Sequence, residues 1–407
     1  MISDQAHIAH WFGQYYRNAV LEVPSRMSKR EWAFDKFVES GNSFSRHRTF
    51  QREAELRQSL VRRPPRGIYH SMAYYSSPGE RRMADKNLIG ADLVFDLDGD
   101  HLSGITDDDF ETMIKLIQHE TWNLWNTFLS RELGMKEEHT TITFSGHRGF
   151  HIHIRDPKIL KLDGKARREI VEYIRGKELD SRLTLERGID HTQQAIGWPK
   201  RFVESLPDVI DEIHASLGPN KAIKKEAEGK ISSYLEELNQ TEAPKKNAIK
   251  ELAKRLSNAA IASEAKKGDF RKLGGKNDKN SDTLTKILKG SAIKKSSAVA
   301  AEIDDVVTHD MHRIIRWASS LHGKTGFRVT PIPIGRLEPN HANAFDPLTE
   351  AVVLPHTGKV EVMGTTNNKK VRIRDDILEV TNGKKMTVNP ASAAFLVLKG
   401  WATLNRA

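Results

Sequence analysis

The stretch LVFDLDGD at residues 93–100 is the most informative part of this chain. Its apolar residues predict a buried β-strand that ends at two aspartates. Side chains alternate between the two faces of a strand, so Asp96 and Asp98 lie on the same face. Neighbouring carboxylates repel each other, and hard oxygen ligands favour Mg²⁺ or Mn²⁺, so we expect a metal site here. The plain alternative is a polar strand end without a ligand.

The residues after this strand predict a long helix followed by a β-hairpin. Thr106 has the character of a helix N-cap, and apolar residues recur at helical spacing over 110–128. Residues 140–144 and 150–154 have strand patterns with a tight turn between them. This order of strand, helix and hairpin places the aspartates and the turn in one α/β unit.

The turn sequence SGHRGFH at residues 145–151 has the composition of an anion-binding loop. Its two glycines let backbone N–H groups approach an anion closely. Ser145, Arg148 and His151 add hydrogen-bond donors, which suits a triphosphate. Two alternatives are an ordinary hairpin with histidines on its wet face and a zinc site built from His151 and His153.

A third motif combines Asp304, Arg316 and the turn SLHGKTG at residues 320–326, which contains His322 and Lys324. The GKT triplet is not a P-loop, because that motif needs Gly five residues before its second Gly and this chain has Ala there. What remains is a basic turn with a carboxylate upstream. Three carboxylates and two phosphate-binding turns are what two-metal nucleotidyl transfer requires.

Composition limits the class of protein. The 407 residues contain no apolar run of membrane-spanning length and no secretory signal, so we expect a cytoplasmic protein with no membrane partner. The absence of cysteine excludes disulfides, Cys-ligated zinc and a Cys nucleophile. A net charge of +10 favours polyanionic partners such as nucleic acid.

Residues 203–300 differ in composition from the rest of the chain. They are rich in Lys, Glu, Ala and Ser and contain only two aromatic residues, too few for a strong independent core. We therefore expect a small all-helical insertion domain over 201–299. It interrupts a discontinuous catalytic domain made of residues 1–200 and 300–407.

The C-terminal part of the chain again shows strand patterns, which cover 327–334, 351–354, 359–363 and 370–373. A terminal helix is expected to begin near Asn389. Together with the strand, helix and hairpin around the aspartates, these patterns predict the α/β fold class.

The segment FDLDGD at residues 95–100 resembles the first motif of haloacid-dehalogenase-type phosphatases. That resemblance implies Asp96 as a nucleophile, with Asp304 and Asp305 as the later metal-binding pair. Asp100 departs from the Thr usual in that motif, and about 90 residues precede it instead of a few. A phosphatase is therefore the alternative function, and a non-catalytic nucleic-acid-binding subunit is another.

Five landmarks occur in the order that is typical of a known family. They are Arg30-Glu31-x-x-Phe34, Arg46-x-x-x-Phe50, the aspartate strand, the Ser145–His151 turn, and Asp304 followed by Ser320-Leu321-His322, with Phe345-Asp346-Pro347 downstream. With these residues the chain resembles the catalytic small subunit of archaeal and eukaryotic DNA primase. The match spans most of the chain except 203–300.

This resemblance implies a prim-pol catalytic core with an RRM-like βαβ half. It implies a nucleotidyltransferase of the primosome that acts in DNA replication as a DNA-directed RNA polymerase. On a single-stranded DNA template this enzyme would make short RNA or DNA primers from NTPs or dNTPs. A large primase subunit would complete a heterodimer, and in an archaeon the cytoplasmic protein would be nucleoid-associated. Two Mg²⁺ or Mn²⁺ ions would be bound by Asp96, Asp98 and Asp304, and the nucleotide by Ser145, Arg148, His151, Arg316, His322 and Lys324.

The chain departs from the family in one chemical feature. Family members usually carry a Cys-containing zinc motif between the aspartate pair and the Ser-Gly turn. This chain has no cysteine, and His101, His119 and His139 do not form a convincing substitute. We therefore predict no structural zinc.

Overall fold

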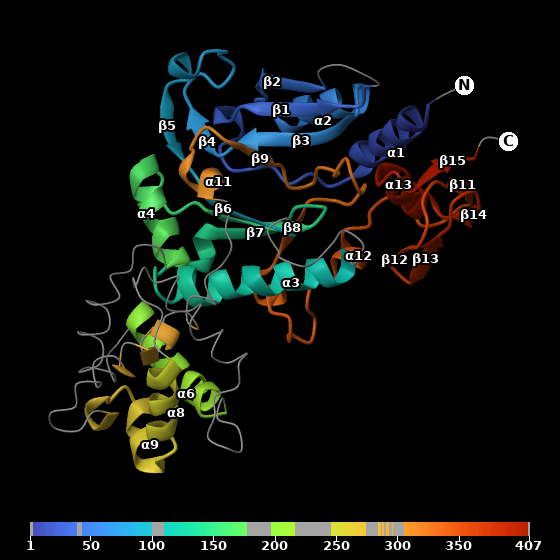
Figure 1. Cartoon of the computed structure of the whole chain (residues 1–407). Coiled ribbons are helices and arrows are strands. Elements are labelled where there is room, and N and C mark those ends of the chain that lie inside the picture. The colour runs from blue at the N-terminus through green and yellow to red at the C-terminus, as the bar shows by residue number, and fades with distance from the viewer. Residues whose placement is uncertain are drawn as a thin grey trace. The chain divides into compact units, whose positions relative to one another are not determined.

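The computed structural model describes residues 3–38, 43–99, 110–176, 197–215, 246–273 and 305–405, with several further residues between 284 and 295. The chain forms two compact units (Figure 1), one of Met1–Val171 with Ala301–Ala407 and the other of Glu172–Ala300. The first is a mixed α/β unit, which confirms the predicted fold class. None of the helices in the described ranges has the length and apolar character needed to span a bilayer.

A four-stranded antiparallel sheet carries the aspartate strand. Its order is β10 (Thr330–Ile332), β7 (Thr140–Phe144), β8 (Gly149–Ile154) and β6 (Leu93–Asp98). Both β6 and β7 run antiparallel to β8, so they are parallel to each other. Helix α3 (Phe110–Asn123) lies between them in the chain and packs on β6 and β8. This split βαβ arrangement is the RRM-like half.

Strand β8 is buried on both faces. Because side chains alternate along a strand, Phe150 and Ile152 occupy one face, while His151 and His153 occupy the other. The predicted helix and hairpin are confirmed, and a π-helical segment, Leu124–Ser130, extends α3. The proposed cap Thr106 lies outside the described residues.

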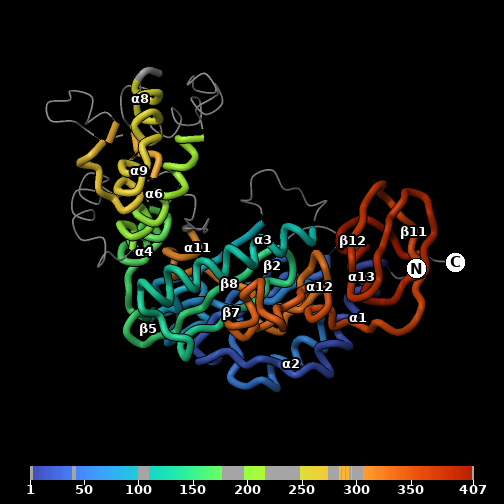
Figure 2. The backbone as a smooth tube through the Cα atoms, turned by 90° about the horizontal axis from the view of Figure 1, so that it is seen from below, coloured from blue at the N-terminus to red at the C-terminus, as the bar shows by residue number. Residues whose placement is uncertain are grey.

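The second four-stranded sheet has the order β2 (Phe44–Arg48), β1 (Trp32–Lys36), β3 (Pro65–Ser71) and β9 (Ile314–Arg316). Helices α1 (Asp4–Asn18) and α2 (Glu53–Arg62) accompany it. Trp32 and Trp317 meet edge to face in its core, which joins β1 to the segment after β9. In Figure 1 helix α3 lies below β7 and β8, and β1 and β3 lie above them, while Figure 2 shows α2 and α3 well separated.

The C-terminal part adds a small sheet of β14 (Lys385–Val388), β11 (Val360–Gly364) and β15 (Ala402–Leu404), beside helix α13 (Pro390–Leu398). The hairpin of β12 (Lys369–Ile373) and β13 (Asp376–Val380) completes it. A further hairpin joins β4 (Ala73–Tyr75) to β5 (Leu88–Ala91).

Two predicted strands near the end of the chain were wrong or too long. Residues 351–354 form no strand, because Asp346 caps the short helix α12 (Pro347–Glu350) and the apolar residues after it pack without a pairing partner. Of 327–334, only β10 pairs in a sheet. The apolar patterns there indicated burial and not strand pairing.

The second unit is helical in its described parts. Helices α6 (Trp198–Ala215), α8 (Lys246–Leu256) and α9 (Ala259–Lys266) pack together. Their shared core is aliphatic and contains Leu206, Ile213, Ile249 and Leu252. The chain breaks between α8 and α9, because Asn258 accepts hydrogen bonds from the first N–H groups of α9 and so starts a new helix.

Candidate active site

The two aspartates of β6 share one face of the sheet. Buried Leu97 separates Asp96 and Asp98, and their side chains are 24% and 42% exposed. In the strand register Asp96 stands opposite His151, and Asp98 stands opposite Gly149. The carboxylates are therefore held by a rigid strand and open to solvent on one side.

Each aspartate has a partner from the neighbouring hairpin. The Nε of Arg148 donates to Oδ1 of Asp98 at 2.9 Å. The Nε2 of His151 lies 3.5 Å from Oδ1 of Asp96. Burial, and then the charge of Arg316, lower the pKa of His151 to about 3. At neutral pH this histidine is therefore an uncharged hydrogen-bonding group beside the carboxylate.

Ser145, the first residue of the predicted anion-binding turn, holds the turn in place. The Oγ of Ser145 accepts a hydrogen bond from the N–H of Gly149 at 3.1 Å, and Ser145 N donates to the Gly149 carbonyl at 2.8 Å. The hydroxyl proton of Ser145 is not used in these bonds. Ser145 therefore fixes the turn and can still donate to a ligand.

The second basic turn packs directly on the first. Gly146 has a φ of +85°, and a Cβ there would lie 2.8 Å from the Cβ of His322. The rings of His147 and His322 stack with their centroids 5.1 Å apart. The Thr325 hydroxyl donates to the carbonyl of Gly146. Glycine at position 146 is required for this approach, which brings two segments far apart in the sequence together.

Two further cations lie near these turns. Arg316, at the end of β9, stacks over the ring of Tyr69 at 4.8 Å. Burial, and then the charge of Arg316, hold the pKa of His322 well below its usual value. Lys324 also contributes to this shift, and its side chain is exposed. The structure thus brings Arg316, His322 and Lys324 to the Ser145 turn.

The sequence-based reasoning missed Lys399 and His147. The Nζ of Lys399 donates to the Nε2 of His147 at 2.9 Å and lies 4.7 Å from the Phe110 ring centroid. Burial, and then the positive charges of Lys399 and Lys324, lower the pKa of His147 to about 2. Lys399 is the C-cap of α13, and no local motif marks it.

Two of the family landmarks lie in ion pairs that contain at least one fully buried partner. Glu31 is fully buried and accepts from Arg46 at 2.9 and 3.2 Å. Arg30 forms a 2.8 Å ion pair with Asp92, which directly precedes β6. Burial alone would raise the pKa of Asp92, but the charges of Arg30 and Arg155 outweigh it and lower the pKa. Arg30 therefore anchors the base of the aspartate strand.

The third predicted carboxylate, Asp304, lies outside the described residues. Helix α11 (Asp305–His309) begins at the next residue and packs against β6, where Val307 joins a core cluster with Val94. Within the described ranges, no three His, Asp or Glu side chains come close enough to form a metal centre by themselves.

Comparison with known proteins decides the family. A family model described as DNA primase small subunit matches residues 95–334. The DNA primase small subunit PriS of Methanothrix thermoacetophila is 34% identical, with 96% of each chain covered. The chain belongs to the DNA primase small subunit family.

Other relatives agree with this membership. PriS of Methanocella arvoryzae is 31% identical over 93% of each chain, and PriS of Halobacterium salinarum is 29% identical over 98% of this chain and 97% of its own. The family supports a catalytic primase function in DNA replication. Nothing in the comparisons favours the alternative function, a phosphatase in which Asp96 would be the nucleophile.

Proposed function

We propose that the chain synthesises short primers on single-stranded DNA by nucleotidyl transfer. The 3′-hydroxyl oxygen of a bound nucleotide or primer attacks the α-phosphorus of an incoming nucleoside triphosphate, and the bond from that phosphorus to pyrophosphate breaks. The observation that carries this proposal is the meeting of the Asp96–Asp98 face with two cation-bearing turns.

A pair of Mg²⁺ or Mn²⁺ ions fits the donor chemistry at the end of β6. Two partly exposed carboxylates on one strand face offer hard oxygen ligands. Asp96, Asp98 and Asp304 would hold the metals. When bound, the ions would favour ionisation of the attacking hydroxyl and offset charge on the leaving pyrophosphate.

The side chains around the turns divide into charged and neutral groups. The triphosphate would be bound by the charges of Arg148, Arg316 and Lys324, with the Ser145 hydroxyl as a further donor. His151 and His322 stay neutral because burial lowers their pKa values, so they orient groups and add no charge. His151 is thus suited to position the carboxylate of Asp96.

The proposed partners follow from the same function. The substrates are a single-stranded DNA template and nucleoside triphosphates, which suits a chain with a net charge of +10. The relatives are named small subunits, and we propose a large primase subunit as the stable partner in a heterodimer.

The test compares two neighbouring aspartates. Asp304→Asn should abolish primer synthesis on unprimed single-stranded DNA, because it removes one proposed metal ligand. Asp305→Asn is the matched control and should retain synthesis, since Asp305 has no role in the proposed site. Equal loss of synthesis in both variants would favour the phosphatase alternative, in which Asp304 and Asp305 bind metal as a pair. Full activity of Asp304→Asn would remove Asp304 from the mechanism.

A further inference from the structure

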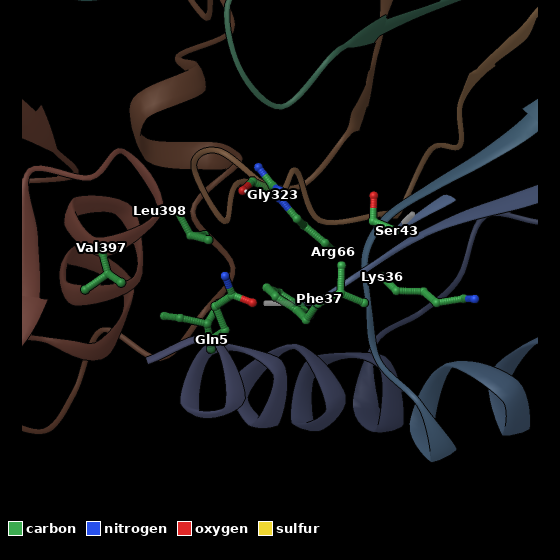
Figure 3. A pocket seen from close by; sticks show the side chains of 10 residues that line it. Gln5, Lys36, Phe37, Ser43, Arg66, Gly323, Val397 and Leu398 are labelled. Atoms are coloured by element: carbon green, nitrogen blue, oxygen red, sulfur yellow. Dashed lines mark hydrogen bonds between the residues drawn. The ribbon is translucent and has the colours of Figure 1, made fainter. Parts of the chain in front are cut away.

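A cavity of about 340 Å³ lies next to the second basic turn and outside the aspartate face (Figure 3). Segments far apart in the sequence line it, namely α1, the facing ends of β1 and β2, the start of β3, the Gly323 turn and the end of α13. Figure 3 shows Arg66, Phe37 and Leu398 approaching the same space from three of these segments. Its volume is in the range of small-ligand sites.

Two charged side chains belong to the described lining of this cavity, and both are cationic. Lys36 is exposed, and no carboxylate in the described part of the chain lies within ion-pair distance of it. The Nε of Arg66 donates to the Gly323 carbonyl at 3.2 Å and lies 3.9 Å from Asp35. Among the residues that the structure describes, no Asp or Glu belongs to the lining. This charge suits a phosphate group.

The opposite part of the lining is apolar. Phe37 is half-buried and meets Phe12 edge to face, with ring centroids 5.3 Å apart. Val397 and Leu398 of α13 add aliphatic surface. A half-buried aromatic ring next to cationic side chains is the combination on which unpaired bases stack in single-strand-binding proteins.

The cavity is joined to the proposed nucleotide site through Gly323. A Cβ at this position would lie 2.2 Å from Cγ of Arg66 and 2.8 Å from its carbonyl oxygen, so the turn and β3 are in close contact. The residue before Gly323 is His322, which stacks on the first turn, and the residue after it is the exposed Lys324. A nucleic-acid strand leaving the nucleotide site could therefore continue into the cavity.

We propose that this cavity binds one unpaired nucleotide of the single-stranded template. The phosphate lies against Lys36 and Arg66, and the base lies against Phe37 and Leu398. A base-paired strand keeps its bases inside the duplex stack and cannot fill the cavity in this way. The proposal rests on the proposed primase function and adds a location for the template.

The first experiment measures DNA binding without nucleotides or synthesis. A fluorescently labelled oligothymidylate is titrated with the full chain at several salt concentrations, and its anisotropy is followed. Lys36→Gln should reduce the slope of log K against log salt by about 0.7, the value for one phosphate contact on a single strand. The control Lys359→Gln changes an exposed lysine outside the lining and should keep the wild-type slope. An unchanged slope in Lys36→Gln would overturn the proposal.

The second variant tests base stacking. Phe37→Leu keeps an apolar side chain near Phe12 and removes the aromatic face, so binding should weaken about fivefold or more, which corresponds to 1 kcal/mol for one stacked base. Wild-type affinity in this variant would exclude the stacking that we propose.

Crosslinking distinguishes the two strands. 5-Iodouracil is placed either in the template or in an annealed primer, and the adduct is mapped by mass spectrometry after irradiation. An adduct on Phe37 from the template supports the proposal. An adduct from the primer alone, or none from either strand, overturns it. Failure of the proposed function would appear instead as absence of primer synthesis by the wild-type chain, which these binding measurements do not require.

Discussion

The role of Lys399 depends on long-range packing. Its ammonium group donates to His147, which stacks on His322, so it connects α13 to both turns. Lys399→Met keeps the aliphatic stem near Phe110 and removes the donor and its charge. A charge-assisted hydrogen bond contributes about 1.5–3 kcal/mol, and this one holds His147 in the turn that would bind the triphosphate, so its loss should raise KM for the nucleotide by up to about tenfold.

Steady-state primer extension measures this effect. The change should fall mainly on KM and less on kcat, since Lys399 does not contact the aspartates through any described bond. Lys369→Met is a suitable control, because Lys369 lies 6.0 Å from the Trp401 ring centroid, next to the same region. A kcat loss with unchanged KM would contradict a role in nucleotide binding.

Buried neutral histidines give the protein a predictable acid sensitivity. Burial, and then the charge of Arg30, lower the pKa of His70 from 6.5 to about 3. The unfolded chain takes up this proton near pH 6.5 and the folded chain does not. The contribution of neutral His70 to the free energy of unfolding is therefore complete above pH 6.5. It is lost as the pH falls toward 3, and about 2 kcal/mol has gone at pH 5.

Urea unfolding of His70→Gln tests this linkage. The free energy of unfolding of the wild type, minus that of the variant, should fall by about 2 kcal/mol between pH 7 and pH 5. A constant difference across this range would show that His70 is not a neutral buried group.

Local rules predict the aspartate strand well and the cationic surroundings poorly. The alternation that puts Asp96 and Asp98 on one face needs only the strand period. The contacts of Lys399 with His147 and of Glu31 with Arg46 could not be predicted, because they are tertiary contacts between separate segments. Among the predicted residues, the packing of His322 on the first turn likewise depends on tertiary structure and not on spacing.

At the scale of elements, the approach of the two turns depends on a missing side chain. Gly146→Ala forces a Cβ to within 2.8 Å of His322 and adds strain at a φ of +85°. Gly134→Ala has a similar φ of +66° but meets no atom within 4 Å, so it carries the backbone strain alone. Gly146→Ala should therefore lower the free energy of unfolding by about 1–3 kcal/mol more than Gly134→Ala.

Denaturant titrations of the two glycine variants give this difference, and nucleotide KM values show whether the turns have moved. Gly146→Ala should raise KM, while Gly134→Ala should leave it at the wild-type value. Equal destabilisation of the two variants would mean that the turns can separate without cost.

Elements with strong periodicity were predicted correctly, and so was the start of α13, where Asn389 is the N-cap. The errors arose where a pairing partner or an internal cap decides the structure. The strand, helix and hairpin around the aspartates form as expected. The strand expected over 351–354 is absent, because an apolar run cannot show whether a pairing partner exists. The break before α9 follows from one capping residue, Asn258, inside an otherwise helical pattern.

At the scale of the whole molecule, the site depends on two sheets built from distant parts of the chain. Strand β9 is contributed by residues after 300, yet it pairs with β3 near the N-terminus. The buried Arg30–Asp92 ion pair connects the segment before β1 to the start of β6. The order of landmarks along the sequence indicated the family, but only the pairing of these strands brings Arg316 toward the aspartate strand.

The most direct test of the central claim is primer synthesis on unprimed single-stranded DNA with labelled nucleotides and Mg²⁺ or Mn²⁺. The wild-type chain, with its large subunit where required, should make template-dependent oligomers. Asp98→Asn should make none, and Asp375→Asn, which changes an exposed carboxylate outside the site, should match the wild type. Oligomers made equally by Asp98→Asn, or no oligomers from the wild type in any condition, would contradict the account.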